Sequence, residues 1–224
     1  NINNDKNKDF MIEMNNEIVK SKHISIWNYI KFLIYYHNFY FYHNIPFILI
    51  NIVILFYIKG NMSNKMLTFI CASFSSWFLH WFSHKCKIFN FISGHRLHHK
   101  ENTTFIEDAH EFLSDVFAAG LGIILINYAI KYITKDFLFN NYVLLFYMFA
   151  FPAVHIFTYH NVLKQSYHQE HHEQIKTNFS PDYFDHIFNT NQDNRIEDTG
   201  HMVPVFFIIG IIVIIIQKYK IIKF

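Results

Sequence analysis

The sequence predicts an all-α fold in the form of an integral-membrane helical bundle. Hydrophobic residues make up 52% of the 224-residue chain and charged residues only 16%, against roughly 25% charged residues in a typical soluble domain. Apolar segments alternate with polar joints, and a bilayer requires each segment to satisfy its own backbone polar groups, which favours helices over strands. The chain also has sixteen histidines, which gather near the ends of these segments.

The apolar segments give the expected order of elements. Residues 1–23 are polar and rich in Asn and Lys, so we expect a soluble tail ahead of a membrane-embedded domain at 24–224. The expected helices are a hairpin at 24–58, broken near 37–46, and then 66–82, 112–133, 137–157 and 203–216. Several of them are short against the roughly 20 residues that span hydrocarbon. A soluble protein with buried core helices is the competing interpretation, but the chain has too little polar sequence to cover five such segments.

The charge pattern excludes some partners. The net charge is +2 and no basic stripe stands out, so we expect no binding to nucleic acid. Lys and Arg are more numerous in the loops 83–110 and 158–202 than in the loops at the other end of the expected helices. This excess favours a cytosolic position for the loops 83–110 and 158–202. Two cysteines cannot build a disulfide framework.

Ten of the sixteen histidines lie in two windows that together cover about a sixth of the chain. The first window holds His80 and His84, followed by His95, His98 and His99; the second holds His155 and His160, followed by His168, His171 and His172. Residues at i, i+3 and i+4 of a helix share a face, so each box can present several imidazoles to one ion. A spacing of five, as between His155 and His160, suits a shared face only where the helix ends or bulges.

The two windows are expected to meet at one end of the bundle. The segments 112–133 and 137–157 separate them and carry the chain across and back. Neutral imidazoles have little reason to gather without a cation, and imidazole suits Zn, Cu, Fe or Ni. Because a structural zinc takes four ligands, eight to ten histidines indicate two metal ions, or one metal ion with many outer histidines.

These motifs resemble the fatty acid hydroxylase superfamily, which includes sterol desaturases, fatty acid 2-hydroxylases and carotenoid hydroxylases. The resemblance extends over roughly residues 71–190 and consists of the three histidine boxes in order and the ending NFSPDYFDHIFNT at 178–190. Asp185, Phe188 and Thr190 fit the family's ending, whereas Asn189 stands where the family usually has Gly.

The resemblance implies a multi-pass membrane core with a cytosolic cap that holds two iron ions, which zinc can replace in purified protein. It implies O2-dependent hydroxylation or desaturation of a lipid, either a fatty acyl chain or a sterol. The electrons would come from a separate donor such as cytochrome b5, and a eukaryotic chain would lie in the endoplasmic reticulum. Carried over by position, the metal ligands are His80, His84, His95, His98, His99, His168, His171 and His172.

Further residues near the boxes have alternative assignments by position. Members of the superfamily carry a histidine upstream of the last box, and either His155 or His160 fills that place. His110 lies where relatives often have a histidine and is either a ligand or a group that bonds to one. Glu107, Asp108, Glu111 and Asp115 could orient imidazoles, although the helix dipole explains each acid at a helix start more simply. The remaining histidines match nothing in the pattern: His23, His37, His43, His186 and His201.

A membrane protein that binds or transports transition metals without oxidase activity is the alternative interpretation. Transporters usually place ionisable residues in the middle of their spans, whereas these boxes lie at span ends and beyond. A zinc hydrolase of the H-E-x-x-H type is not indicated, because neither His110-Glu111 nor His172-Glu173 continues into that motif. The pattern therefore favours the lipid oxidase.

Overall fold

The computed structural model describes residues 44–93, 95, 99, 104–158, 171–172, 176–192, 197 and 199–224. Within these ranges the chain forms helices and no strand, which confirms the all-α class. The expected polar tail at 1–23, the first arm of the hairpin and the histidines His23, His37, His43, His98, His160 and His168 lie outside the described residues.

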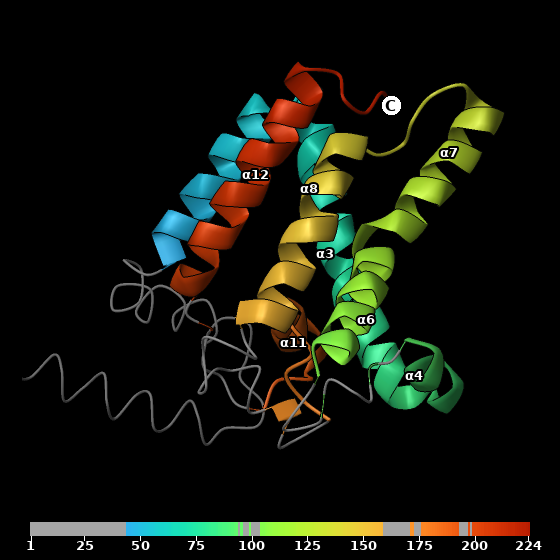
Figure 1. The fold of residues 1–224 in the computed structure, drawn as a ribbon, viewed down its shortest axis with the longest axis vertical. Helices are drawn as coiled ribbons and strands as arrows, with labels where there is room; N and C mark the ends of the chain where they lie inside the picture. Colours follow the sequence, from blue (N-terminus) through green and yellow to red (C-terminus); the bar gives the residue numbers. More distant parts are fainter. Residues whose placement is uncertain are drawn as a thin grey trace, which may run out of the picture.

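The long helices run alternately up and down a bundle (Figure 1). In chain order the elements are the helix Asn44–Tyr57, α3 (Met62–Lys85), α4 (Lys87–Ser93), α6 (Phe105–Val116), η1 (Phe117–Leu121), α7 (Gly122–Thr134), α8 (Asn141–Pro152), η2 (Ala153–Thr158), α11 (Asp182–Phe188), η3 (Thr199–Met202) and α12 (Val203–Lys218). η1 and η2 are π-helical stretches that continue α6 and α8. The short helices α4 and α11 were not expected, because seven residues are too few to show a periodic pattern.

Capping residues, rather than apolar residues, decide where two of the helices begin. Thr104 and Glu107 form a capping box, so α6 begins at Phe105, ahead of the expected start at 112. The side chain of Asn140 accepts hydrogen bonds from two amides in the first turn of α8, so residues 137–140 stay outside that helix. The apolar pattern therefore locates these helices but misplaces their ends.

The helix α8 is the centre of the bundle and packs against α3, α6, η1 and α12. Most of its residues are buried, and most of these contribute to the main apolar core. Two glycines allow close helix packing in this core. A Cβ atom on Gly210 of α12 would lie 2.4 Å from Cδ1 of Ile54, and one on Gly120 of η1 would lie 2.5 Å from Cβ of Met148.

Amide side chains tie together the loops at one end of the bundle. The Nδ2 group of Asn140 donates to the carbonyl of Lys59 over 2.7 Å, and that of Asn64 donates to the carbonyl of Leu138 over 2.7 Å. The Oε1 atom of Gln217 accepts from the Lys59 amide at 2.8 Å. These bonds satisfy backbone groups of the loops. They fix the helix ends at the end of the bundle that lies away from the histidine boxes.

Among the described residues one helix, Thr199–Lys218, is long and apolar enough to cross a membrane, with a mean hydropathy of 2.5. Only 17% of its most apolar window is buried within the protein, so it does not resemble the core helix of a soluble domain. The helices Asn44–Tyr57, Gly122–Thr134 and Asn141–Ile156 are apolar but shorter. The multi-pass arrangement therefore stays a prediction.

Candidate metal centre

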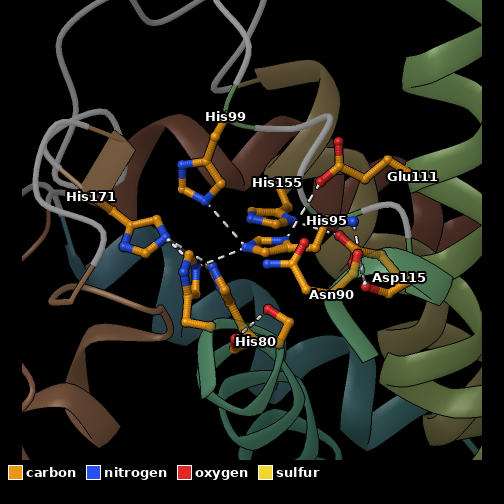
Figure 2. A network of polar contacts seen from close by, with 11 residues as sticks. His80, Asn90, His95, His99, Glu111, Asp115, His155 and His171 are labelled. Carbon is orange, nitrogen blue, oxygen red and sulfur yellow. Dashed lines mark hydrogen bonds and ion pairs between the residues drawn. The ribbon is translucent and has the colours of Figure 1, made fainter. Parts of the chain in front are cut away.

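Five histidines from both sequence windows converge in the structure, and Figure 2 shows four of them, His80, His95, His99 and His171, with their rings turned toward one another. The five residues are His80, His84, His95, His99 and His171. Each offers one ring nitrogen, and these five nitrogens all lie within 4.8 Å of one another. His80 and His84 are one turn apart near the end of α3, as their spacing predicts. The expected meeting of the two windows is therefore confirmed for these five residues.

Short distances separate the Nε2 atoms of this cluster. Nε2 of His171 lies 3.0 Å from Nε2 of His80 and 3.1 Å from Nε2 of His84. Nε2 of His95 lies 2.8 Å from that of His84 and 3.2 Å from that of His99. Ring nitrogens this close together meet in one small space, which suits a cation with imidazole ligands.

A backbone carbonyl fixes the ring of His171. Its Nδ1 atom lies 2.5 Å from the carbonyl oxygen of Thr177. A carbonyl oxygen only accepts, so Nδ1 carries the hydrogen, and the Nε2 atom of the neutral ring is an unprotonated acceptor. Metal-binding histidines typically donate their second N–H to a carbonyl or carboxylate in this way. The His171 ring is thus oriented for binding a metal through Nε2.

His155 lies next to the five convergent histidines. Its ring centroid is 5.3 Å from that of His80, and its side chain is 2% exposed. Its Nδ1 atom lies 2.5 Å from Oδ2 of Asp115. His155 belongs to the π-helical stretch η2. The structure places this member of the pair beside the centre, while His160 lies outside the described residues.

The other described histidines lie at or beyond the edge of the cluster. The ring centroid of His172 is 4.7 Å from that of His99. His110 is exposed on α6 and is not among the five that converge. His186 on α11 and His201 in η3 also lie outside the convergent set.

Burial keeps the clustered imidazoles neutral. It lowers the pKa of His84 to about 4, with a smaller effect from His172. Burial also lowers the pKa of His95 and His171 well below the usual value, and repulsion between neighbouring histidines adds to both shifts. Because neutral imidazole is the form that binds metal, these rings are in their ligand form at neutral pH.

Two acids one turn apart on α6 lie beside the histidines, although a helix-dipole role was the simpler expectation for each. Asp115 bonds to His155, and Oε1 of Glu111 lies 3.9 Å from Nδ1 of His95. Burial, with repulsion from nearby acids, raises the pKa of Glu111 to about 10. This contact therefore joins two uncharged groups and is no ion pair. The i, i+4 spacing of Glu111 and Asp115 was the available sequence signal for a shared role.

The segment after the last box covers the cluster, which the sequence did not indicate. The buried ring of Phe179 lies with its centroid 5.3 to 5.6 Å from the centroids of His80, His84 and His171. Asn189, which stands where the family usually has Gly, has a φ of 54° and a ψ of 40°. Asn tolerates this left-handed conformation better than most residues, so Asn189 can take the place of a Gly in this turn.

An apolar cavity of about 630 Å³ extends from the histidines between α3, α4, α6, α7 and η2. Its lining includes His80, His95 and His155, and Leu79 and Ile123 are among its apolar lining residues. The volume falls in the range of roughly 300–1,000 Å³ that is typical of small-molecule pockets. The arrangement can hold a cation at one end and an apolar group beside it.

These features define a helical protein with a buried, histidine-rich site that fits metal binding. The fatty acid hydroxylase family model matches residues 65–190, which is more than half of the chain. The chain therefore belongs to the fatty acid hydroxylase family, which confirms the resemblance and implies oxidoreductase activity on lipids. No curated protein and no solved structure matches the chain.

Proposed function

We propose that this protein is a membrane di-iron oxidoreductase that uses O2 to hydroxylate or desaturate a lipid, either a fatty acyl chain or a sterol. The observation that carries the proposal is the convergence of five histidines, two of which (His80 and His95) also line an apolar cavity, in a chain of the fatty acid hydroxylase family. The histidines supply ligands for a metal ion, and the cavity supplies space for an apolar substrate.

The number of histidines supports two ions rather than one. Besides the five convergent residues, His155 and His172 lie within ring contact of the cluster, and His98, His160 and His168 belong to the same boxes in sequence. A single ion with four to six ligands leaves several of these without a use. When bound, iron would supply the redox chemistry for O2 activation, which protein side chains cannot provide.

The residues of the chain would hold and shield the reacting groups. Thr177 and Asp115 orient the rings of His171 and His155, and the apolar walls of the cavity keep water from the lipid. Hydroxylation consumes R–H, O2, two electrons and two protons and yields R–OH and water. Desaturation consumes the same co-reactants and yields an alkene and two waters. A separate donor such as cytochrome b5 would provide the electrons.

The membrane location is supported by the candidate span Thr199–Lys218. Large apolar side chains on this helix are exposed, among them Phe207, Ile208 and Ile212, and burying them in lipid would remove their apolar surface from water. We propose a multi-pass protein with the histidine centre on the cytosolic side, in the endoplasmic reticulum if the chain is eukaryotic.

The test is expression in a host that lacks its own lipid hydroxylase, followed by lipid profiling under ¹⁸O2. We expect the wild-type chain to yield a lipid that gains one labelled oxygen or loses two hydrogens. His84→Ala should abolish the product, because it removes a central ring, and His186→Ala on α11 should retain it. Metal binding without any change in lipids would contradict the oxidase and favour a metal-binding protein.

A further inference from the structure

We propose that Asp185 is a positioning residue. It fixes the position of the His171 ring relative to His80 and His84 and thereby sets the metal affinity of the centre. The inference rests on the proposed metal site and assigns part of its affinity to a carboxylate that touches no metal. Asp185 lies on α11, outside the three histidine boxes.

Asp185 is fully buried and accepts four hydrogen bonds. Its Oδ1 atom accepts from the indole Nε1 of Trp77 at 3.0 Å, from the hydroxyl of Thr190 at 2.6 Å and from the amide of Phe179 at 3.0 Å. Its Oδ2 atom accepts from the amide of Ser180 at 2.9 Å. The carboxylate thus connects one side chain of α3 with the segment that follows the last histidine box.

The first connection fixes the position of this segment against α3. Trp77 precedes His80 by three residues, so the two side chains lie on neighbouring positions of one helix face. The indole also stacks on Phe188 of α11, with ring centroids 4.5 Å apart. The bond from Trp77 to Asp185 therefore holds α11 at the part of α3 that carries the first two ligand candidates.

The second connection reaches His171 through the backbone. The amides of Phe179 and Ser180, which Asp185 holds, follow closely after Thr177, whose carbonyl accepts the Nδ1–H group of His171. The amide of Asn178 between them donates to the Thr190 carbonyl at 2.9 Å. With this loop fixed, the Thr177 carbonyl has one position, and that position sets where Nε2 of His171 points.

The arrangement requires a carboxylate rather than a side chain of similar shape. An Asn side chain offers one acceptor oxygen, and its NH2 group would face a donor where the second oxygen now accepts. At least one buried donor would lose its partner. The segment would shift to relieve this, and the His171 ring would move with it.

Asp182 provides a matched control on the same helix. It is also buried, and its Oδ2 atom accepts from the amide of Glu197 at 2.9 Å, in a different segment of the chain. Asp182→Asn therefore makes the same chemical change in α11 while leaving the bonds of Asp185 to Phe179 and Ser180 in place.

The experiment titrates the full-length protein in detergent with Co²⁺ and with Fe²⁺ under anaerobic conditions. We expect Asp185→Asn to lower metal affinity by about 10-fold or more, the range known for residues that support metal ligands, and to change the Co²⁺ absorption bands. Asp182→Asn should keep the wild-type affinity and spectrum. Thr190→Val removes one hydrogen-bond donor and keeps the carboxylate, so it should give a smaller loss of metal affinity. This variant replaces Asp185→Asn in the test if Asp185→Asn does not fold.

Equal metal affinity and spectrum in Asp185→Asn and the wild type would overturn the inference. An equal loss in Asp182→Asn and Asp185→Asn would also overturn it, because that result indicates a general effect on α11. Absence of metal binding in the wild type would instead overturn the proposed function itself.

Discussion

The Nε2 atoms of His80 and His171 lie 3.0 Å apart, although 91 positions separate these residues in the chain. His80 is on α3, and His171 belongs to the box that follows α8 and η2. Their contact brings the first and last histidine boxes into one centre. The consequences for metal binding, stability and substrate choice can each be tested.

His171→Ala should lower the metal content by at least one ion per chain. The ring lies within 3.0 to 3.1 Å of two other ligand candidates, so its loss opens the centre. Elemental analysis of purified protein measures the effect, and His186→Ala is the control on a histidine outside the convergent set. An unchanged metal content in His171→Ala would show that this ring is not a ligand.

Asp115→Asn should weaken metal binding by about 10- to 100-fold, because the carboxylate that orients His155 becomes an amide. Competition with a metal chelator gives the affinity. Asp136→Asn changes an exposed acid in the loop after α7 and should have no effect. Equal affinity in Asp115→Asn and the wild type would assign Asp115 to helix stability alone.

The metal-free protein should lose stability as the pH falls from about 7 towards 4. Free imidazole titrates near 6.5, whereas the folded pKa of His84 is about 4, and those of His95 and His171 are also lowered. The unfolded state therefore takes up protons first, which decreases the free energy of unfolding. Denaturation of metal-stripped protein at a series of pH values measures this, and a flat profile would contradict neutral imidazoles.

Glu111 should act with the opposite sign above neutral pH. Its pKa is about 10 in the folded protein and roughly 4.3 when unperturbed, so the folded state holds a proton that the unfolded state has released. Its contribution to stability should therefore decline as the pH rises from about 4.3 towards 10, and above about pH 7, where the histidines no longer titrate, the net stability should fall. Glu111→Gln should remove this alkaline decline and keep the acidic one. Persistence of the decline in the variant would assign it to other groups.

Ile123→Trp should restrict the substrates that the protein accepts. Ile123 of α7 lines the cavity, and a larger ring there reduces the space next to the histidines. We expect products from bulky lipids to fall several-fold relative to those from short or slender ones. Ile133→Trp, at an exposed position of the same helix, should leave the profile unchanged. The same profile in both variants would show that substrate does not occupy this cavity.

Gly210→Ala should destabilise the protein by about 1–3 kcal/mol, the usual cost of overpacking. The added Cβ atom would lie 2.4 Å from Cδ1 of Ile54. Ile54→Val removes that Cδ1 atom and should restore part of the loss in the double variant. Gly122→Ala is the control, since its Cβ meets only ordinary contacts of 3.5 Å or more. Thermal unfolding in detergent measures the wild type and each of these variants.

Apolar runs and histidine spacing allowed the sequence to predict the helices and the meeting of the two windows. Both are local or nearly local properties. An apolar segment favours a helix wherever it lies in the bundle, and a spacing of four places His80 and His84 on one face. The helix starts at Phe105 and Asn141 were missed, because single capping side chains decide them.

The surroundings of the histidines were decided by the tertiary structure alone. The sequence placed Asp115 among four acids that could orient imidazoles and Asp185 in the family's ending, but it named no partner for either. Only the packing of α6 and α11 against the ends of η2 and α3 gives them partners. Such contacts join segments tens of residues apart, and no periodic pattern encodes them. The sequence by itself determined which imidazoles are available, and the tertiary structure decided which nitrogen of His155 and His171 is held by a partner.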